Sequence, residues 1–242
     1  MRAPGARLWL LDLDNTLHDA SWSMMPEVNR LMTDWIARRL SLTHAEATAL
    51  RQTYWHRYGA TLLGLVRHHR ANADEFLRQT HPLEALGRHV RRVRGLGRRV
   101  RMLNGDRWLV TNAPREYAHG LIRLLGLKGC FDRVIAIEDM RAMGRLRPKP
   151  SAWLWRHLIR QSGRPRTRIC MVDDSTENLR GAHRAGLKTA RIWCSHTQRR
   201  QARQQGRPLS ARRPSFVHLQ VHSITDLALR GQSQPEASCQ RW

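Results

Sequence analysis

Two aspartates stand two residues apart in the segment WLLDLDNTLH, directly after an apolar run near the start of the chain. A second acidic pair, Asp173 and Asp174, also ends an apolar run much later. If Asp12 and Asp14 converge with this second pair, four carboxylates repel one another unless a cation lies among them, and Mg²⁺ is the natural choice. With that cation bound, one carboxylate can act as a nucleophile while its neighbour donates a proton to a leaving oxygen.

Further polar residues offer the hydrogen-bond donors and the positive charge that phosphoryl transfer requires. Thr111 and Asn112 follow another apolar run, and Lys149 stands between two prolines that stiffen its loop. Each motif has a plainer alternative when taken alone. An Asp-x-Asp pair often forms a turn or a helix cap, and we expect Ser175 to cap the helix that follows it. Glu138 and Asp139 are as readily solvated as functional.

The elements that must position these residues are strands alternating with helices. Apolar runs of strand length recur at 7–11, 107–111, 133–137, 168–172 and 188–193. Helical periodicity lies between the later runs, at 116–125, 152–161 and 176–185. This alternation predicts an α/β fold with a Rossmann-like, doubly wound parallel sheet. Ligands bind beyond the carboxyl ends of such strands, where the aspartates and Thr111 stand.

The stretch from residue 19 to 103 has a different character, because helical periodicity dominates at 28–40, 45–58 and 74–79. We expect a helical cap domain inserted after the first strand. The predicted core then comprises residues 1–18 and 104–242. Within it, 195–213 is expected to be a flexible basic loop, and 216–221 and 224–229 a last strand and helix.

The net charge of +24 would ordinarily point to nucleic acid. However, the basic residues are spread along the whole chain, and no zinc-finger, RNP-type or basic-zipper pattern accompanies them. An arginine-rich coding bias is the preferred explanation, and we expect nucleic acid to bind only nonspecifically. A polyanion-binding protein that kept the fold is the alternative to an enzyme.

The compartment expected from the sequence is the cytoplasm. No window approaches the ~18 uninterrupted apolar residues of a membrane helix, and Asp12 and Asp14 break the N-terminal apolar run, so no membrane association is expected. The cysteines are Cys130, Cys170, Cys194 and Cys239. Because they are widely spaced, we expect free and mostly buried thiols.

Four motifs in order, DLDNT at 12–16, VTN at 110–112, RPKP at 147–150 and VDDS at 172–175, resemble those of the haloacid dehalogenase-like hydrolase superfamily. The resemblance implies that Asp12 attacks phosphorus to form an aspartyl phosphate, and that Asp14 is general acid and then general base. It further implies that Thr111 and Asn112 bind the phosphoryl oxygens and that Lys149 neutralises Asp12 and the phosphate. Asp12, Asp174 and the Asp14 carbonyl would hold Mg²⁺. Asp173 would be a direct or water-mediated partner of the ion. Because carbon–halogen cleavage needs no proton donor, Asp14 favours a phosphatase over a dehalogenase.

A segment of the expected cap, YWHRYGATLLGLVRHH at 54–69, resembles the pyrimidine 5'-nucleotidase branch of that superfamily. This implies hydrolysis of UMP and CMP, with Tyr54, Tyr58 and Thr61 facing the substrate. The alternative is that the two tyrosines, four residues apart, pack against the interior. His18 stands where the branch usually has a tyrosine, near the expected pocket mouth. Other small esters, such as phosphoglycolate, a sugar phosphate or pyridoxal phosphate, are the alternative substrates.

Overall fold

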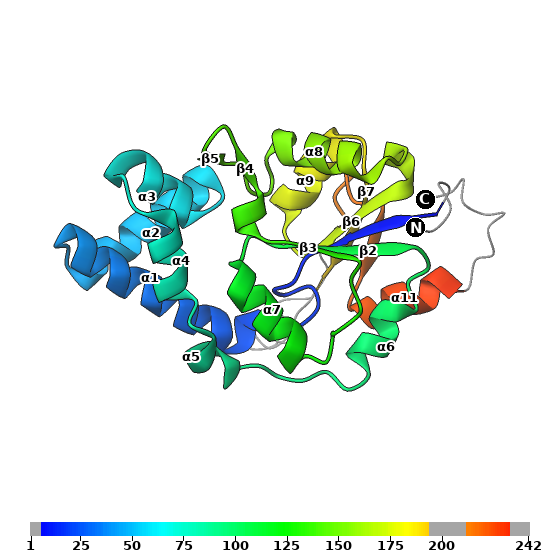
Figure 1. Ribbon diagram of the computed structural model, residues 1–242, viewed down its shortest axis with the longest axis horizontal. Helices are drawn as coiled ribbons and strands as arrows, with labels where there is room; N and C mark the ends of the chain where they lie inside the picture. Colours follow the sequence, from blue (N-terminus) through cyan, green and yellow to red (C-terminus); the bar gives the residue numbers. More distant parts are fainter. Residues whose placement is uncertain (1–5, 194–211, 233–242) are drawn as a thin grey trace.

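The computed structural model describes residues 6–193 and 212–232, which form a parallel sheet with helices on both faces and a helical region at one end (Figure 1). The sheet order is β3-β2-β1-β6-β7-β8, and all neighbours are parallel. The strands are β1 (Leu8–Leu11), β2 (Asp106–Val110), β3 (Arg133–Ile135), β6 (Ile169–Asp173), β7 (Lys188–Ile192) and β8 (Leu219–Val221). The predicted doubly wound parallel sheet is therefore present.

Two helical layers cover the sheet. One face carries α6 (Leu96–Arg101), α7 (Arg115–Leu124) and α11 (Ile224–Gln232), and the other carries α8 (Ala152–Ser162) and α9 (Thr176–Arg184) (Figure 1). Because strand side chains alternate, Trp9 and Leu11 of β1 pack in the first layer, whereas Leu8 and Leu10 pack in the second. The strand order reverses between β1 and β6, which opens a crevice at their carboxyl ends.

The helical region follows β1 and lies to one side of the sheet (Figure 1). It comprises the 3-10 turn η1 (Ala20–Trp22) and the helices α1 (Met24–Leu40), α2 (His44–Tyr58), α3 (Thr61–His69), α4 (Ala73–Thr80) and α5 (Leu83–Gly87). These helices bury their own apolar cluster, in which Trp35 contacts Phe76 edge to face at 5.0 Å between ring centroids. The cap therefore has an interior of its own.

Helix α1 belongs to both interiors. Met24 and Val28, in its first turns, pack in the cluster on the sheet, while Trp35 and Ile36 pack in the cap cluster. The predicted cap of residues 19–103 also includes α6, whose Leu96 packs in the sheet cluster instead.

Some local structure differs from the sequence predictions. The third strand ends at Ile135, and the 3-10 turn η2 (Ile137–Asp139) and a hairpin of β4 (Arg141–Ala142) and β5 (Arg145–Leu146) follow it. Strands of two residues are too short to show alternation, so no pattern predicted them. A third 3-10 turn, η3 (Arg166–Arg168), precedes β6. Of the predicted basic loop at 195–213, only the last two residues lie within the described residues.

Two of the sequence expectations concern burial and membranes. Cys130 and Cys170 are free and buried, as predicted, and Cys194 and Cys239 lie outside the described residues. Within the described ranges, none of the helices combines the length and the apolar character that crossing a bilayer requires.

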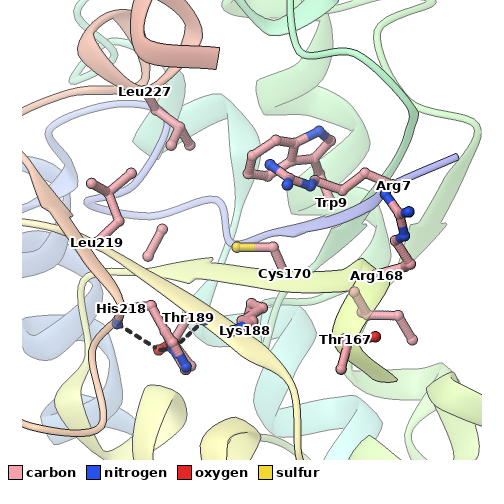
Figure 2. A pocket seen from close by; sticks show the side chains of 12 residues that line it. Arg7, Trp9, Thr167, Arg168, Cys170, Lys188, Thr189, His218, Leu219 and Leu227 are labelled. Atoms are coloured by element: carbon pink, nitrogen blue, oxygen red, sulfur yellow. Dashed lines mark hydrogen bonds between the residues drawn. The ribbon is translucent and has the colours of Figure 1, made fainter. Parts of the chain in front are cut away.

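A small cavity lies at the amino-terminal end of the central strands (Figure 2). Trp9, Cys170 and Leu227 of α11 are among its lining residues, and a hydrogen bond joins the nearby Thr189 and His218. Its volume of about 20 Å³ leaves room for roughly one water molecule. Because the acidic motifs follow the carboxyl ends of these strands, this cavity at their amino-terminal ends forms no part of the candidate active site.

Candidate active site

The sheet register brings the predicted acidic motifs together. Leu11 pairs with Val172, and the backbone N–H of Asp12 donates to the carbonyl of Val172 at 3.0 Å, so Asp12 lies beside Asp173. On the other side of β1, strand β2 ends at Val110, and Thr111 follows it. The carboxyl ends of three adjacent strands therefore present the candidate catalytic residues at the reversal point of the sheet.

Lys149 lies between two of these carboxylates. Its ammonium group donates to Asp12 Oδ1 at 2.6 Å and to Asp173 Oδ2 at 2.9 Å, and its side chain is 1% exposed. Burial alone would lower the pKa of Lys149, but the two aspartates outweigh burial and raise it. The lysine is therefore charged and serves as the counter-ion of both acids.

Asn112 holds the loop that carries Lys149, and it also lines the pocket described below. Its side-chain Oδ1 accepts the backbone N–H of Lys149 at 3.0 Å, and its Nδ2 donates to the Lys149 carbonyl at 3.0 Å. Both polar atoms of the amide thus hold the lysine loop, and the second N–H of Nδ2 is left to donate, so the predicted contact with phosphate stays a prediction. On the other side of the loop, a Cβ at Gly181 of α9 would lie 2.8 Å from the Pro150 carbonyl, so only glycine permits this approach.

Three carboxylates form the candidate metal site. Asp12, Asp173 and Asp174 each offer an oxygen, and these oxygens lie within 4.8 Å of one another. Burial raises the pKa of Asp12 to about 7, with Asp173 adding to the rise and Lys149 opposing it. Burial and the two neighbouring acids hold the pKa of Asp174 well above its usual range. One lysine does not balance three carboxylates, so this all-oxygen cluster fits a hard divalent cation.

The three acids are supported differently. Asp173 accepts hydrogen bonds from the Ser175 backbone at 2.8 Å and from Asn178 Nδ2 at 3.0 Å, in addition to that of Lys149. Thr16 donates to Asp12 Oδ2 at 3.1 Å. Ser175 also accepts from the Asn178 backbone and caps α9, as predicted.

Asp14 lies in a separate hydrogen-bonded group. Its Oδ1 accepts the Tyr117 hydroxyl at 2.8 Å and contacts His18 Nε2 at 2.9 Å. Burial would raise the pKa of Asp14, but the hydrogen bond and charge of His18 and the hydroxyl of Tyr117 together lower it. The Tyr117 hydroxyl also lies 2.6 Å from the sulfur of Met24 on α1. His18 therefore holds the second aspartate of the DLDNT motif.

A pocket of about 1030 Å³ joins this site to the cap. Its core wall includes Thr111, Lys149 and the four aspartates. Its cap wall includes residues of α3 and α4 and one face each of α1 and α2, the latter with Met25, Val28, Asn29, Met32, Arg51, Gln52, Trp55 and His56. Thr111 Oγ1 accepts the Ala113 N–H at 3.0 Å, which leaves its own hydroxyl hydrogen to donate.

The predicted cap contacts are only partly placed at the pocket. Tyr54 and Tyr58 are not among its lining residues, since their hydroxyls pair with His69 and His68 of α3 at 2.7 and 2.5 Å. Both tyrosines pack with the cap cluster, and their contact with substrate stays a prediction. Thr61 does line the pocket, but its hydroxyl donates to the Arg51 carbonyl at 3.1 Å.

Several site residues were not identified from the sequence. Thr16 and Asn178 stand four and five residues after the aspartates they hold, and that short spacing was the available signal. Tyr117 is 103 residues from Asp14, so no local pattern links them. Glu138, left open between solvation and function, accepts the Arg115 N–H at the start of α7 and has a structural role.

These observations define a class of α/β protein. An aspartate pair, a buried lysine and a second acidic pair meet at the carboxyl ends of the central strands of a parallel sheet, under a helical cap. A family model described as haloacid dehalogenase-like hydrolase matches residues 6–186. The chain belongs to this family, as the four motifs predicted.

A curated relative is also similar to this chain. Phosphate metabolism protein 8 of Saccharomyces cerevisiae is 22% identical over an alignment of 194 residues that covers 76% of this chain and 60% of the yeast protein. The match therefore spans less than two thirds of that relative.

Solved structures show the same fold. L-2-haloacid dehalogenase from Xanthobacter autotrophicus is 14% identical, with a TM-score of 0.59 and coverage of 95% of this chain and 99% of that one. CbbY from Rhodobacter sphaeroides, in complex with phosphate, is 18% identical, with a TM-score of 0.61 and coverage of 95% and 100%. YfnB from Bacillus subtilis, bound to magnesium, is 14% identical, with a TM-score of 0.56 and coverage of 93% and 97%.

Proposed function

We propose that this hydrolase is a Mg²⁺-dependent phosphatase that cleaves phosphate monoesters through an aspartyl-phosphate intermediate. The observation that carries the proposal is the Asp12 carboxylate, which Lys149 holds at 2.6 Å in a pocket that also receives Asp14. A phosphoryl group bound there meets a nucleophile, a fixed positive charge and a second carboxylate on one wall.

The chain's own residues supply most of the chemistry. Asp12 attacks phosphorus, while the Lys149 ammonium and the Thr111 hydroxyl stabilise the charge on the phosphoryl oxygens. Asp12, Asp174 and the Asp14 carbonyl would hold Mg²⁺, which when bound would neutralise more of that charge. Asp173 already accepts from Lys149 and Asn178, which supports an indirect role for it at the ion.

Asp14 handles the protons in this scheme. Its lowered pKa suits the second step, in which an ionised carboxylate removes a proton from the water that attacks the aspartyl phosphate. In the first step Asp14, in its protonated form, gives its proton to the leaving oxygen, and the water of the second step returns one to it. His18 Nε2 and the Tyr117 hydroxyl, which both contact Asp14 Oδ1, hold the carboxyl group in place for both transfers.

Two features favour phosphate esters over halogenated acids, although dehalogenases share the fold. Asp14 supplies proton transfer that carbon–halogen cleavage does not need. The yeast relative is also named for phosphate metabolism.

For the substrate, the resemblance of residues 54–69 supports UMP and CMP. Phosphoglycolate, sugar phosphates and pyridoxal phosphate are the alternatives. The buried free thiols of Cys130 and Cys170 support the cytoplasm as the compartment.

The test is phosphate release from a panel of these esters with Mg²⁺ or with EDTA, comparing the wild type with Asp12→Asn. We expect Mg²⁺-dependent release by the wild type and none by the variant. Equal inertness of both proteins on every ester would refute the enzyme and leave the polyanion-binding alternative. Turnover in which UMP and CMP rank low would remove only the nucleotidase assignment.

A further inference from the structure

Arg51 lies on the cap wall of the pocket, on helix α2. Its Nε donates to Thr33 Oγ1 at 3.1 Å, and its Nη1 donates to Asn29 Oδ1 at 2.8 Å. Both partners belong to α1, and Thr33 is 2% exposed. The half-buried guanidinium is therefore held in one position by two neutral oxygen atoms.

The charge of Arg51 has no acidic counterpart among the described residues. None of their ion pairs includes Arg51, whereas Arg30, on the neighbouring helix, pairs with both Glu27 and Asp34. Burial lowers the pKa of Arg51. A half-buried charge without a partner is costly, and this cost falls when an anion binds beside it.

Three donors of the guanidinium are available for such an anion. A guanidinium carries five N–H groups, and the bonds to Thr33 and Asn29 use two of them. The planar fork matches a carboxylate or a phosphate, which accept two parallel hydrogen bonds. Arg51 therefore has the chemistry of a preformed anion subsite.

The pocket is large enough to separate two anionic groups. Its core wall holds Lys149 and the four aspartates, and its cap wall holds Arg51, within a volume of about 1030 Å³. A phosphoryl group at Asp12 fills only a small part of that space. The two positive side chains thus stand on opposite walls of one pocket.

We propose that Arg51 binds a second anionic group of the substrate, a carboxylate or a phosphate, while the phosphoryl group to be cleaved lies at Asp12. This inference rests on the proposed phosphatase function. Among the substrates considered above, it favours phosphoglycolate over UMP and CMP, whose bases are neutral, and within the sugar phosphates it favours those with a second phosphate.

The test compares esters that differ only in the second anion. Phosphoglycolate is paired with 2-hydroxyethyl phosphate, and fructose 1,6-bisphosphate with fructose 6-phosphate, so the two arms distinguish a carboxylate from a phosphate. We expect the wild type to prefer the ester with the second anionic group in at least one pair, by about 10- to 100-fold in kcat/KM, the range for a charge-assisted pair. Arg51→Gln should abolish most of that preference, and Arg51→Lys should restore part of it.

Arg57→Gln is the matched control, because Arg57 lies on the same helix and is not among the residues that line the pocket. Calorimetric binding of the same esters in an Asp12→Asn background tests the subsite without turnover. Thermal melts check that each variant folds, and the wild-type preference tests the proposal even where Arg51→Gln does not fold.

The outcomes separate the two proposals. Inertness towards every ester, with binding that still prefers the esters with a second anionic group, would refute the phosphatase and retain the subsite. Equal use and equal binding of the paired esters by the wild type would refute the subsite alone. An equal loss on all esters in Arg51→Gln would place Arg51 at the transferred phosphoryl group, and a loss confined to UMP would place it at a base; either result overturns the proposal.

Discussion

Replacing Lys149 with methionine removes the only side-chain cation within hydrogen-bond distance of Asp12 and Asp173 among the described residues. The two ion pairs are almost completely buried, with side-chain exposures of 1% for Lys149, 9% for Asp12 and 1% for Asp173. Breaking a buried pair by removing one partner typically costs about 3–5 kcal/mol, because the other charge stays buried. We expect Lys149→Met to lose about that much unfolding free energy in EDTA.

Added Mg²⁺ should reduce this loss, because a cation among Asp12, Asp173 and Asp174 replaces the missing counter-charge. Lower pH should reduce it as well, because burial already raises the pKa of Asp12 to about 7 against the opposing charge of Lys149, and Asp12 takes up a proton still more readily once the lysine is gone. Urea unfolding followed by tryptophan fluorescence measures both effects. Lys128→Met is the control, because Lys128 is exposed and should respond to neither change.

The electrostatic account of the site would be wrong if Lys149→Met were as stable as the wild type in EDTA. It would also be wrong if Mg²⁺ stabilised the two proteins equally, because the stabilisation by the ion would then not depend on the uncompensated charge of the carboxylates.

Three further predictions concern residues around the site. Tyr117→Phe removes the 2.8 Å hydrogen bond to Asp14 and should lower kcat by about 10- to 100-fold. Tyr54→Phe, which removes a hydroxyl paired with His69, should leave kcat unchanged. Equal kcat values for the two variants would contradict the role of Tyr117. Asn112→Ala should lower kcat by roughly ten-fold without weakening inhibition by inorganic phosphate, because Asn112 holds the Lys149 backbone. Weaker inhibition would instead show that Asn112 binds phosphate directly. Burial lowers the pKa of His81 from 6.5 to about 4, so the unfolded chain binds a proton that the folded protein does not. Stability should therefore hold down to about pH 6.5 and fall by about 2 kcal/mol by about pH 5, and His81→Gln, which cannot titrate, should remove that part of the loss in pH-dependent urea unfolding.

The strands and the core acids were predictable because their signals are local. Asp12 and Asp173 each end an apolar run, and parallel pairing carries such ends to one edge. The role of Asn112 was not predictable, because its partner is the backbone of a loop 37 residues away. The pairing of Tyr54 and Tyr58 with α3 was not predictable, because helical spacing shows that two residues share a face but not which neighbour that face meets. The role of Arg51 was missed because it depends on the lack of an acidic partner among the described residues, which the sequence does not reveal.

The two interiors of the molecule share helix α1, and this has a consequence for folding cooperativity. The helix has 17 residues and is about 25 Å long, and it carries Val28 in the sheet cluster and Ile36 in the cap cluster. Neither interior is complete without it, so loss of one removes apolar contacts from the other. The cap and the core should therefore melt in a single transition, and a fragment that ends between them would expose half of one helix face to water.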